Sequence, residues 1–140
     1  MTQIDFYTRA GDKLATACRI AHKARQQNLR ITVFCPDAAL AREFDRLLWT
    51  QPATGFLPHC PSGHPLAAVT PVLIDAAGDC TLNSEVLINL HHEWPACFSR
   101  YQRLAEIVTN DPDDAAQARA RFKHYRDRGY DLRTHDLSGA

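Results

Sequence analysis

Histidines are the side chains whose types and spacing come nearest to forming a chemical site in this sequence. His59, Cys60 and His64 lie close together, and His91 and His92 are adjacent. Zinc sites, however, take paired ligands at fixed short spacing from two knuckles or from one helix face. Adjacent residues of an extended segment also point to opposite sides, which would separate His91 from His92. We therefore expect no metal site and no cofactor, and we interpret these histidines as structural or exposed.

Cysteines give no clear site either. The sequence holds five of them, an odd number, and no CxxC pair. They are widely scattered, at Cys18, Cys35, Cys60, Cys80 and Cys97. This pattern argues against a disulfide framework and predicts reduced thiols in the core.

Motifs for catalysis and for nucleotide binding are missing from the sequence. No GxSxG pattern surrounds a serine. The turn "TRAGDK", residues 8–13, lies where a nucleotide-binding fold would hold a phosphate, but it matches neither GxxxxGK[ST] nor GxGxxG. We interpret it as an ordinary surface turn with Asp12 near the start of a helix. The expected protein is not an enzyme, and a nucleotide-dependent enzyme is the less favoured alternative.

A basic face near the C-terminus is a candidate for binding. Arg119, Phe122, Lys123 and Arg126 follow the spacing i, i+3, i+4, i+7, so a helix places three cations around one aromatic ring. The basic residues of the segment as a whole are Arg119, Arg121, Lys123, Arg126 and Arg128. This face suits an acidic peptide with an apolar end, or the phosphates of a nucleic acid. A solvated basic face that binds nothing is the alternative.

The elements that position these residues belong to one domain, residues 1–140. Acidic and basic side chains balance at 16 each, so any electrostatic function must come from local clustering. No apolar run approaches the roughly 18 residues needed to span a bilayer, and the first residues do not read as a signal peptide. We therefore expect a cytoplasmic protein without a membrane segment.

Strand-like and helix-like segments alternate along the chain. The patterns predict strands at 4–8, 30–35, 68–75, 85–90 and 106–110, and helices at 11–28, 38–49, 95–105 and 112–128. Asp37 stands where it can cap the second helix. The alternation predicts an α/β protein with a Rossmann-like three-layer fold, in which helices flank a mainly parallel central sheet.

Several blocks along the chain resemble a known family. "DFYT" near the start, "LLW" followed by Pro52, then "GFLPH", "VLINL" and the closing "ARARFKHYRDRGYDL" resemble, in matching order and nearly end to end, the chi subunit of bacterial DNA polymerase III. The block from Trp49 to His59 is the most specific of these. The resemblance implies a non-catalytic, Rossmann-like adaptor of the clamp-loader assembly. In that family one surface holds the psi subunit and another holds the acidic C-terminal tail of single-stranded DNA-binding protein.

The resemblance also assigns residues to these two surfaces. It implies that Trp49 and Phe56, within the block that holds Pro52, Pro58 and His59, contribute to the surface that binds psi or, alternatively, a helicase. Aromatics on a proline-stiffened loop offer large apolar area at little ordering entropy. The alternative is that Trp49 and Phe56 fill the core, which is the interpretation we prefer for Leu57.

The matching tail-binding residues are Arg119, Phe122, Lys123 and Arg126, and the tail is rich in aspartate and ends in phenylalanine. Two positions depart from the family pattern. Ala115 stands where some relatives carry a lysine, and Phe122 replaces a tyrosine, which leaves the pocket weaker or tuned to a different tail. We expect the protein to link the clamp loader, through psi, to single-stranded DNA that is coated by its binding protein. A protein that binds nucleic acid directly through the basic helix is the main alternative.

Overall fold

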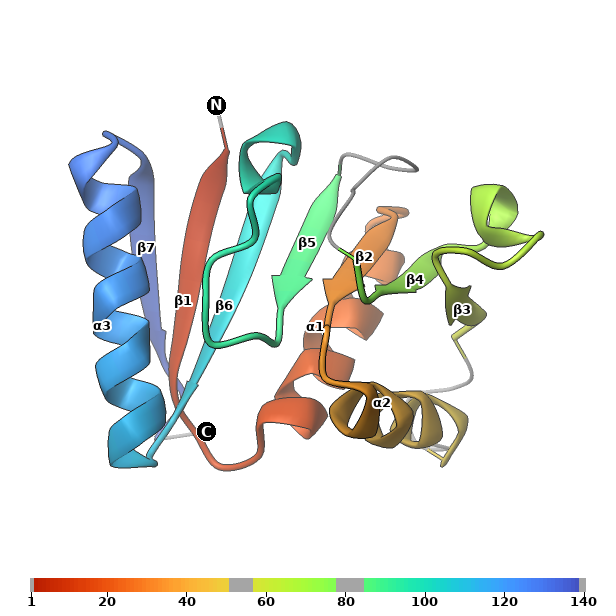
Figure 1. The fold of residues 1–140 in the computed structure, drawn as a ribbon, viewed down its shortest axis with the longest axis horizontal. Coiled ribbons are helices and arrows are strands. Elements are labelled where there is room, and N and C mark those ends of the chain that lie inside the picture. The colour runs from red at the N-terminus through yellow and green to blue at the C-terminus, as the bar shows by residue number, and fades with distance from the viewer. Residues whose placement is uncertain (1, 51–56, 78–84, 139–140) are drawn as a thin grey trace.

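Seven parallel strands form the centre of the computed structural model, which describes residues 2–50, 57–77 and 85–138. The strands are β1 (Gln3–Ala10), β2 (Ile31–Phe34), β3 (His59–Pro61), β4 (Val72–Asp75), β5 (Val86–Asn89), β6 (Arg103–Thr109) and β7 (Asp131–Asp136). Their order in the sheet is β3-β4-β2-β5-β6-β1-β7, and every pairing among them is parallel (Figure 1). The prediction of a mainly parallel α/β fold is confirmed.

Three α-helices of the described residues follow strands, and an aspartate caps the start of each. They are α1 (Lys13–Gln26), α2 (Ala38–Thr50) and α3 (Pro112–Asp127). The carboxylates of Asp12, Asp37 and Asp111 accept hydrogen bonds from backbone N–H groups of the first turns. Such caps satisfy donors that have no partner within the helix. The predicted helices at 11–28, 38–49 and 112–128 are confirmed, and so is the capping role of Asp37.

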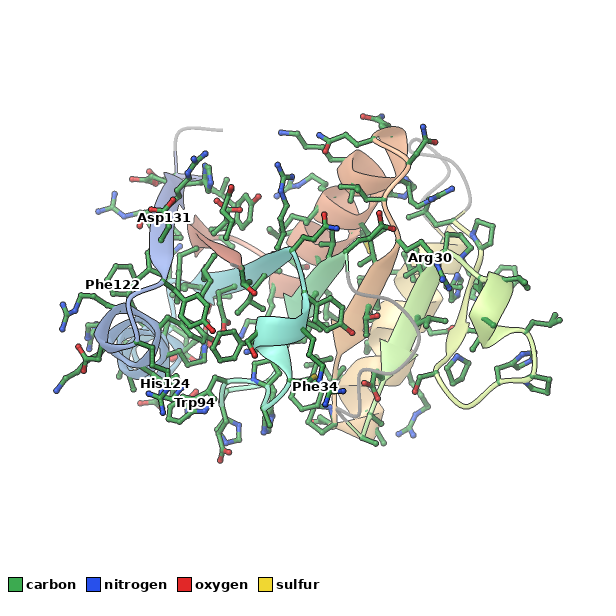
Figure 2. The ribbon with its side chains drawn as sticks, turned by 90° about the horizontal axis from the view of Figure 1, so that it is seen from above. Arg30, Phe34, Trp94, Phe122, His124 and Asp131 are labelled. Carbon is green, nitrogen blue, oxygen red and sulfur yellow. The ribbon has the colours of Figure 1, made fainter. Side chains whose placement is uncertain are left out.

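Alternation along the strands divides the core into two layers. On β6, Ala105 and Ile107 pack with α1 and α2, whereas Leu104 and Val108 pack in the cluster that includes α3. Successive side chains of a strand point to opposite faces, so α1 and α2 cover one face of the sheet and α3 covers the other. Figure 2 shows α1 and α3 on opposite sides of the strands. The predicted three-layer arrangement is confirmed.

The predicted helix at 95–105 is wrong. Only a single 3₁₀ turn forms there, η3 (Phe98–Arg100), and β6 begins already at Arg103. A second 3₁₀ turn, η2 (Ala67–Val69), occupies the start of the predicted strand at 68–75. Pairing of β6 with both β1 and β5 outweighs the local preference for helix, and Phe98 and Tyr101 are buried as part of the core.

Two strands have no counterpart in the prediction. The edge strand β3 has three residues and ends at a proline. The opposite edge strand β7 is exposed and polar, with the sequence "DLRTHD". Neither carries an apolar alternation, because edge strands are paired on one side only and need not bury both faces.

The cysteines divide into two groups. Cys18, Cys35 and Cys60 are free and buried, as predicted. Burial raises the pKa of the Cys18 and Cys35 thiols to about 11, and the nearby carboxylates of Asp12 and Asp37 act in the same direction. Cys97, by contrast, is half-buried and disulfide-bonded, which the expectation of reduced thiols did not include. Cys80 lies outside the described residues. Spacing along the sequence does not report which thiols the fold brings together.

Candidate partner-binding surfaces

Trp49 at the end of α2 is the most prominent exposed aromatic side chain of the first predicted surface. Its side chain is 63% exposed, which excludes the interpretation of Trp49 as core filling. Pro58 is also exposed. Pro52 and Phe56 lie outside the described residues. We call Trp49, Pro52, Phe56, Pro58 and His59 the aromatic loop.

His59 holds the two described ends of the aromatic loop together. One ring nitrogen, Nδ1, lies 2.7 Å from the carbonyl oxygen of Leu57, and the other, Nε2, lies 2.9 Å from a carboxylate oxygen of Asp45 in α2. The Trp49 ring makes an edge contact with the imidazole, with ring centroids 5.3 Å apart. Leu57 is buried in the core, as predicted. The geometry therefore fixes Trp49 against a buried support and leaves most of its surface in solvent.

Arg119, Phe122, Lys123 and Arg126 of α3 form the second predicted surface, which we call the basic face. Arg119, Lys123 and Arg126 are exposed. Within the described part of the chain, Arg119 and Lys123 form no ion pair, and Arg126 has only a solvent-exposed contact of 3.7 Å with Asp127. The Phe122 ring is half-buried and meets the ring of Phe6 edge-on, with centroids 5.2 Å apart. Two of the three cations, Arg119 and Lys123, are therefore unpaired among the described residues and lie on the same face as a partly exposed aromatic ring.

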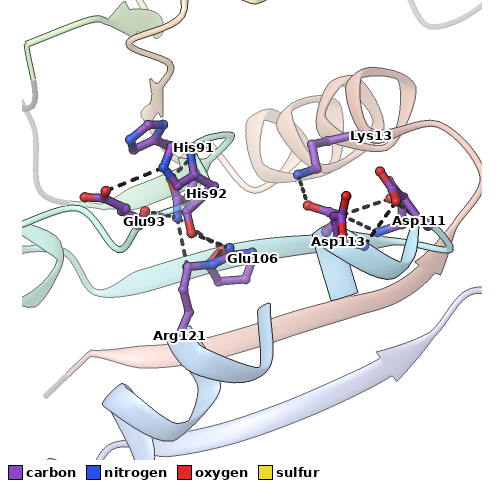
Figure 3. Close-up of polar contacts among 11 residues, drawn as sticks. Lys13, His91, His92, Glu93, Glu106, Asp111, Asp113 and Arg121 are labelled. Atoms are coloured by element: carbon purple, nitrogen blue, oxygen red, sulfur yellow. Dashed lines mark hydrogen bonds and ion pairs between the residues drawn. The ribbon is translucent and has the colours of Figure 1, made fainter. Parts of the chain in front are cut away.

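Arg121 does not belong to this surface, although the sequence groups it with the cations. Its guanidinium is buried, where Nε donates to the Glu106 carboxylate at 3.0 Å and Nη1 donates to the carbonyl oxygen of His92 at 2.7 Å (Figure 3). Burial raises the pKa of the Glu106 carboxyl, and the positive charge of Arg121 opposes that shift. Tyr125 donates to the same carboxylate at 2.6 Å. These contacts tie α3 to β6 and set the direction in which the basic face points.

Trp94 is an exposed aromatic that the sequence analysis did not single out. Its indole stacks on His124 of α3, with ring centroids 3.6 Å apart and an interplanar angle of 14°, and it is 41% exposed (Figure 2). Burial lowers the pKa of His124, and the charge of Arg128 acts in the same direction. The sequence does contain a sign of this exposed residue, because Trp94 is a large aromatic within the polar stretch "HHEWP".

His91, His92 and Glu93 converge at the carboxyl end of β5. Their ligand atoms lie within 4.8 Å of one another, so this group is able to hold a metal ion. The expectation that the two histidines point apart is wrong, because their ring centroids lie 4.1 Å from each other. The segment is not extended there but bends after β5. Burial lowers the pKa of His91, and His92 adds to this effect.

The turn at 8–13 is occupied by structural contacts. Asp12 accepts hydrogen bonds from the N–H groups of Leu14 and Ala15, as expected for a residue at a helix start. Lys13 forms an ion pair of 2.8 Å with Asp114 at the start of α3. The cation of this turn is therefore committed to a contact within the protein, in agreement with its interpretation as a surface turn.

The fold and these surfaces define a parallel α/β protein with two exposed candidate binding surfaces. A family model described as "DNA polymerase III chi subunit, HolC" matches residues 1–133. A protein of Pseudomonas aeruginosa named DNA polymerase III subunit chi is 33% identical over 98% of both chains. A protein of the same name from Haemophilus influenzae is 30% identical, over 86% of this chain and 85% of its own length. The protein of that name from Escherichia coli is 27% identical, over 84% of this chain and 80% of its own length.

The chain therefore belongs to the chi subunit family of DNA polymerase III, whose members are accessory subunits of DNA replication. The family resemblance inferred from the sequence blocks is confirmed. None of the helices in the described residues is both long and apolar enough to cross a membrane.

Proposed function

We propose that the protein is a non-catalytic adaptor of the replisome, which binds psi through the aromatic loop and the tail of single-stranded DNA-binding protein through the basic face. Psi would connect it to the clamp loader, and a helicase is the alternative partner of the aromatic loop. Membership of the chi family supports this role. The observation that carries it is that Trp49 of the aromatic loop and the cations Arg119 and Lys123 of the basic face are exposed on separate elements.

The basic face is complementary to an acidic tail that ends in phenylalanine. Arg119 and Lys123 are available to carboxylates, because neither is engaged by an acidic residue of the described chain. The half-buried Phe122 ring offers an apolar surface to the terminal aromatic side chain. Two or three charge-assisted contacts of roughly 1.5–3 kcal/mol each, less the cost of ordering the tail, give affinities of about micromolar strength. Weak binding suits repeated capture and release.

The two departures from the family pattern act at this surface. Ala115 is half-buried against the core, and an alanine brings no cation to the first turn of α3. Phe122 lacks the hydroxyl of a tyrosine, and its ring packs edge-on against the ring of Phe6. We therefore expect recognition of the tail to depend mainly on Arg119, Lys123 and Arg126.

The aromatic loop has the properties of an interface anchor. Trp49 is large and exposed, and the buried His59 contacts its ring edge. Interface hot spots are enriched in tryptophan, and an anchor that is already ordered loses little entropy on binding. A protein partner that covers Trp49 would also cover the exposed Pro58 nearby in sequence. An adaptor of this kind works where the chromosome is copied, in the bacterial cytoplasm.

Fluorescence anisotropy with three probes tests the adaptor against direct nucleic-acid binding by the basic face. The probes are an aspartate-rich peptide ending in phenylalanine, the same peptide without that phenylalanine, and a single-stranded oligonucleotide. The proposal predicts that the first peptide binds and that removal of its phenylalanine abolishes binding. If Arg119→Glu removes oligonucleotide binding with a steep salt dependence and leaves the peptide unaffected, the basic face serves nucleic acid and the adaptor proposal fails.

A further inference from the structure

A cavity of about 530 Å³ lies between α1 and the strands β6, β1 and β7. Alternate residues of the strands line it, including Asp5 and Tyr7 of β1, Arg103 of β6, and Arg133 and His135 of β7. These side chains point to the face opposite α3, because their neighbours Ile4, Leu104 and Leu132 pack in the cluster that includes α3. The cavity is therefore separate from the basic face.

Positive charge is concentrated in this cavity. The chain as a whole carries equal numbers of acidic and basic residues. The cavity, however, is lined by Arg19, Lys23, Arg103 and Arg133, whereas its only carboxylate among the described residues is that of Asp5. Asp5 is already engaged by His135 at 3.1 Å and by Gln3 at 3.2 Å.

The four cations have no acidic partner among the described residues. Arg19 donates to the hydroxyl of Thr16 at 3.2 Å, which leaves its charge uncompensated. Like charges that face one concave space repel one another, and a concave wall of low polarity focuses their field. An anion is the ligand that relieves this repulsion, and arginine is the residue that best matches the oxygens of phosphate.

An aromatic pair stands in the same cavity. The rings of Tyr7 and His135 are stacked, with centroids 4.8 Å apart and an interplanar angle of 18°. The His135 side chain is 45% exposed, so part of it remains accessible to a ligand. Ile20 and Leu137 add apolar lining. A volume of this size falls in the range of small-molecule sites, about 300–1,000 Å³.

We propose that this cavity binds a nucleotide unit, with the phosphate held by Arg19, Lys23, Arg103 and Arg133 and the base placed against the stacked Tyr7 and His135. The combination of clustered cations with an aromatic platform is the combination that nucleotide recognition requires. A free nucleotide and one nucleotide of a single strand present the same chemistry. An acidic peptide would match the cations but would make no specific use of the aromatic pair.

Isothermal titration of the full chain with ADP, inorganic pyrophosphate and a thymidine oligonucleotide tests the proposal. Binding of ADP that is tighter than binding of pyrophosphate supports a site for a free nucleotide, and binding of the oligonucleotide alone supports a site for a single strand. The proposal is overturned if neither ADP nor the oligonucleotide binds, or if ADP binds no tighter than pyrophosphate and the oligonucleotide does not bind.

Charge-reversal variants locate the binding. Arg103 and Arg133 are exposed at their strands, so Arg103→Glu and Arg133→Glu should fold, which their melting curves will check. Each should weaken nucleotide binding at least tenfold, whereas the matched control Arg119→Glu on the basic face should leave it unchanged. If only the control Arg119→Glu loses nucleotide binding, the nucleotide binds at α3, and the proposal of a site in the cavity is refuted. If Arg103→Glu and Arg133→Glu weaken binding of an acidic peptide but leave nucleotide binding unchanged, the cavity binds a peptide, which also refutes the proposal.

Discussion

Arg121 of α3 donates to Glu106 of β6 at 3.0 Å, and their side chains are 1% and 0% exposed. The same carboxylate accepts hydrogen bonds from Tyr125 and Asn89. Arg121 also reaches the backbone carbonyl of His92, so one buried network joins α3, β6 and the segment that follows β5. The network fixes the rotation of α3 about its axis and thereby decides which of its cations face solvent.

Removal of Glu106 should destabilise the fold strongly. Glu106→Ala leaves Arg121 buried without its counter-charge, which typically costs about 3–5 kcal/mol in the free energy of unfolding. Urea denaturation measures this change. The matched control is Glu43→Ala on α2, which breaks an exposed ion pair with Arg46 and should cost less than about 1 kcal/mol. Equal effects of the two substitutions would contradict a structural role for the buried network.

Asp114 makes the stability of the fold depend on pH. Its carboxylate accepts hydrogen bonds from Lys13 at 2.8 Å and from the backbone N–H of Thr109 at 2.8 Å. Burial disfavours the charged form, but the hydrogen bonds from Lys13 and Thr109 outweigh it, so the pKa of Asp114 lies below its ordinary value. A carboxyl whose pKa is lower in the folded state stabilises the fold above the pKa of the unfolded chain, about 4, and loses this effect as the pH falls through the folded pKa.

Asp114→Asn should therefore cost about 1–3 kcal/mol near neutral pH, and the difference from wild type should shrink as the pH falls below about 4. Urea denaturation at a series of pH values measures this difference. Asp113→Asn is the matched control in the same helical turn, because Asp113 is exposed and its loss should cost less than about 1 kcal/mol at any pH. If the difference in the free energy of unfolding between Asp114→Asn and wild type stays constant down to about pH 2.5, the contacts assigned to Asp114 are refuted.

Local patterns predicted three of the four expected helices correctly but gave no sign of the edge strands β3 and β7. The helices α1, α2 and α3 carry their own signals, because a capping aspartate and an apolar stripe are both visible in a short window of sequence. The strand β7 pairs with β1 in the register Gln3 to Asp131, at the far end of the chain. Its polar residues give no local sign of this pairing, so only the folded sheet reveals the strand.

The candidate sites show the same division. Helical spacing alone places Arg119 and Lys123 on one face, and the structure leaves both of them exposed. Helical spacing also leaves Arg121 off this face. It could not show that Arg121 is buried, because the partner of Arg121 is Glu106 on another element. The cations of the cavity, such as Lys23 and Arg133, come from opposite ends of the chain, and no sequence window contains both.

Trp49→Ala should release psi without loss of stability. Because the side chain is 63% exposed, its removal should hardly change the melting temperature, whereas loss of an interface anchor should weaken psi binding at least tenfold. Phe56→Ala, outside the described residues, should behave in the same way. The neighbouring Leu48 is buried, so Leu48→Ala should instead cost about 2–5 kcal/mol of stability. Titration of psi and thermal melting distinguish these outcomes, and a large drop in melting temperature for Trp49→Ala would assign it to the core.

Arg119→Glu should remove binding of the acidic tail and spare the fold and psi. Reversal of one exposed charge loses a contact of about 1.5–3 kcal/mol and adds repulsion, so the affinity for the tail peptide should fall more than tenfold. Arg42→Glu on α2 is the matched control, because Arg42 is also exposed and lies outside the basic face. Anisotropy titrations measure both variants, and equal losses would mean that net charge rather than the basic face governs binding.

The most direct test of an adaptor with two independent surfaces is to titrate the tail peptide into protein saturated with psi. Trp49 lies in the last turn of α2, and the basic face lies on α3. Figure 1 shows these two helices at opposite ends of the sheet, α3 beside β7 and α2 below β2 and β4. We predict that the dissociation constant of the peptide is the same with and without psi, so that both partners are held at once. Displacement of the peptide by psi would contradict the account.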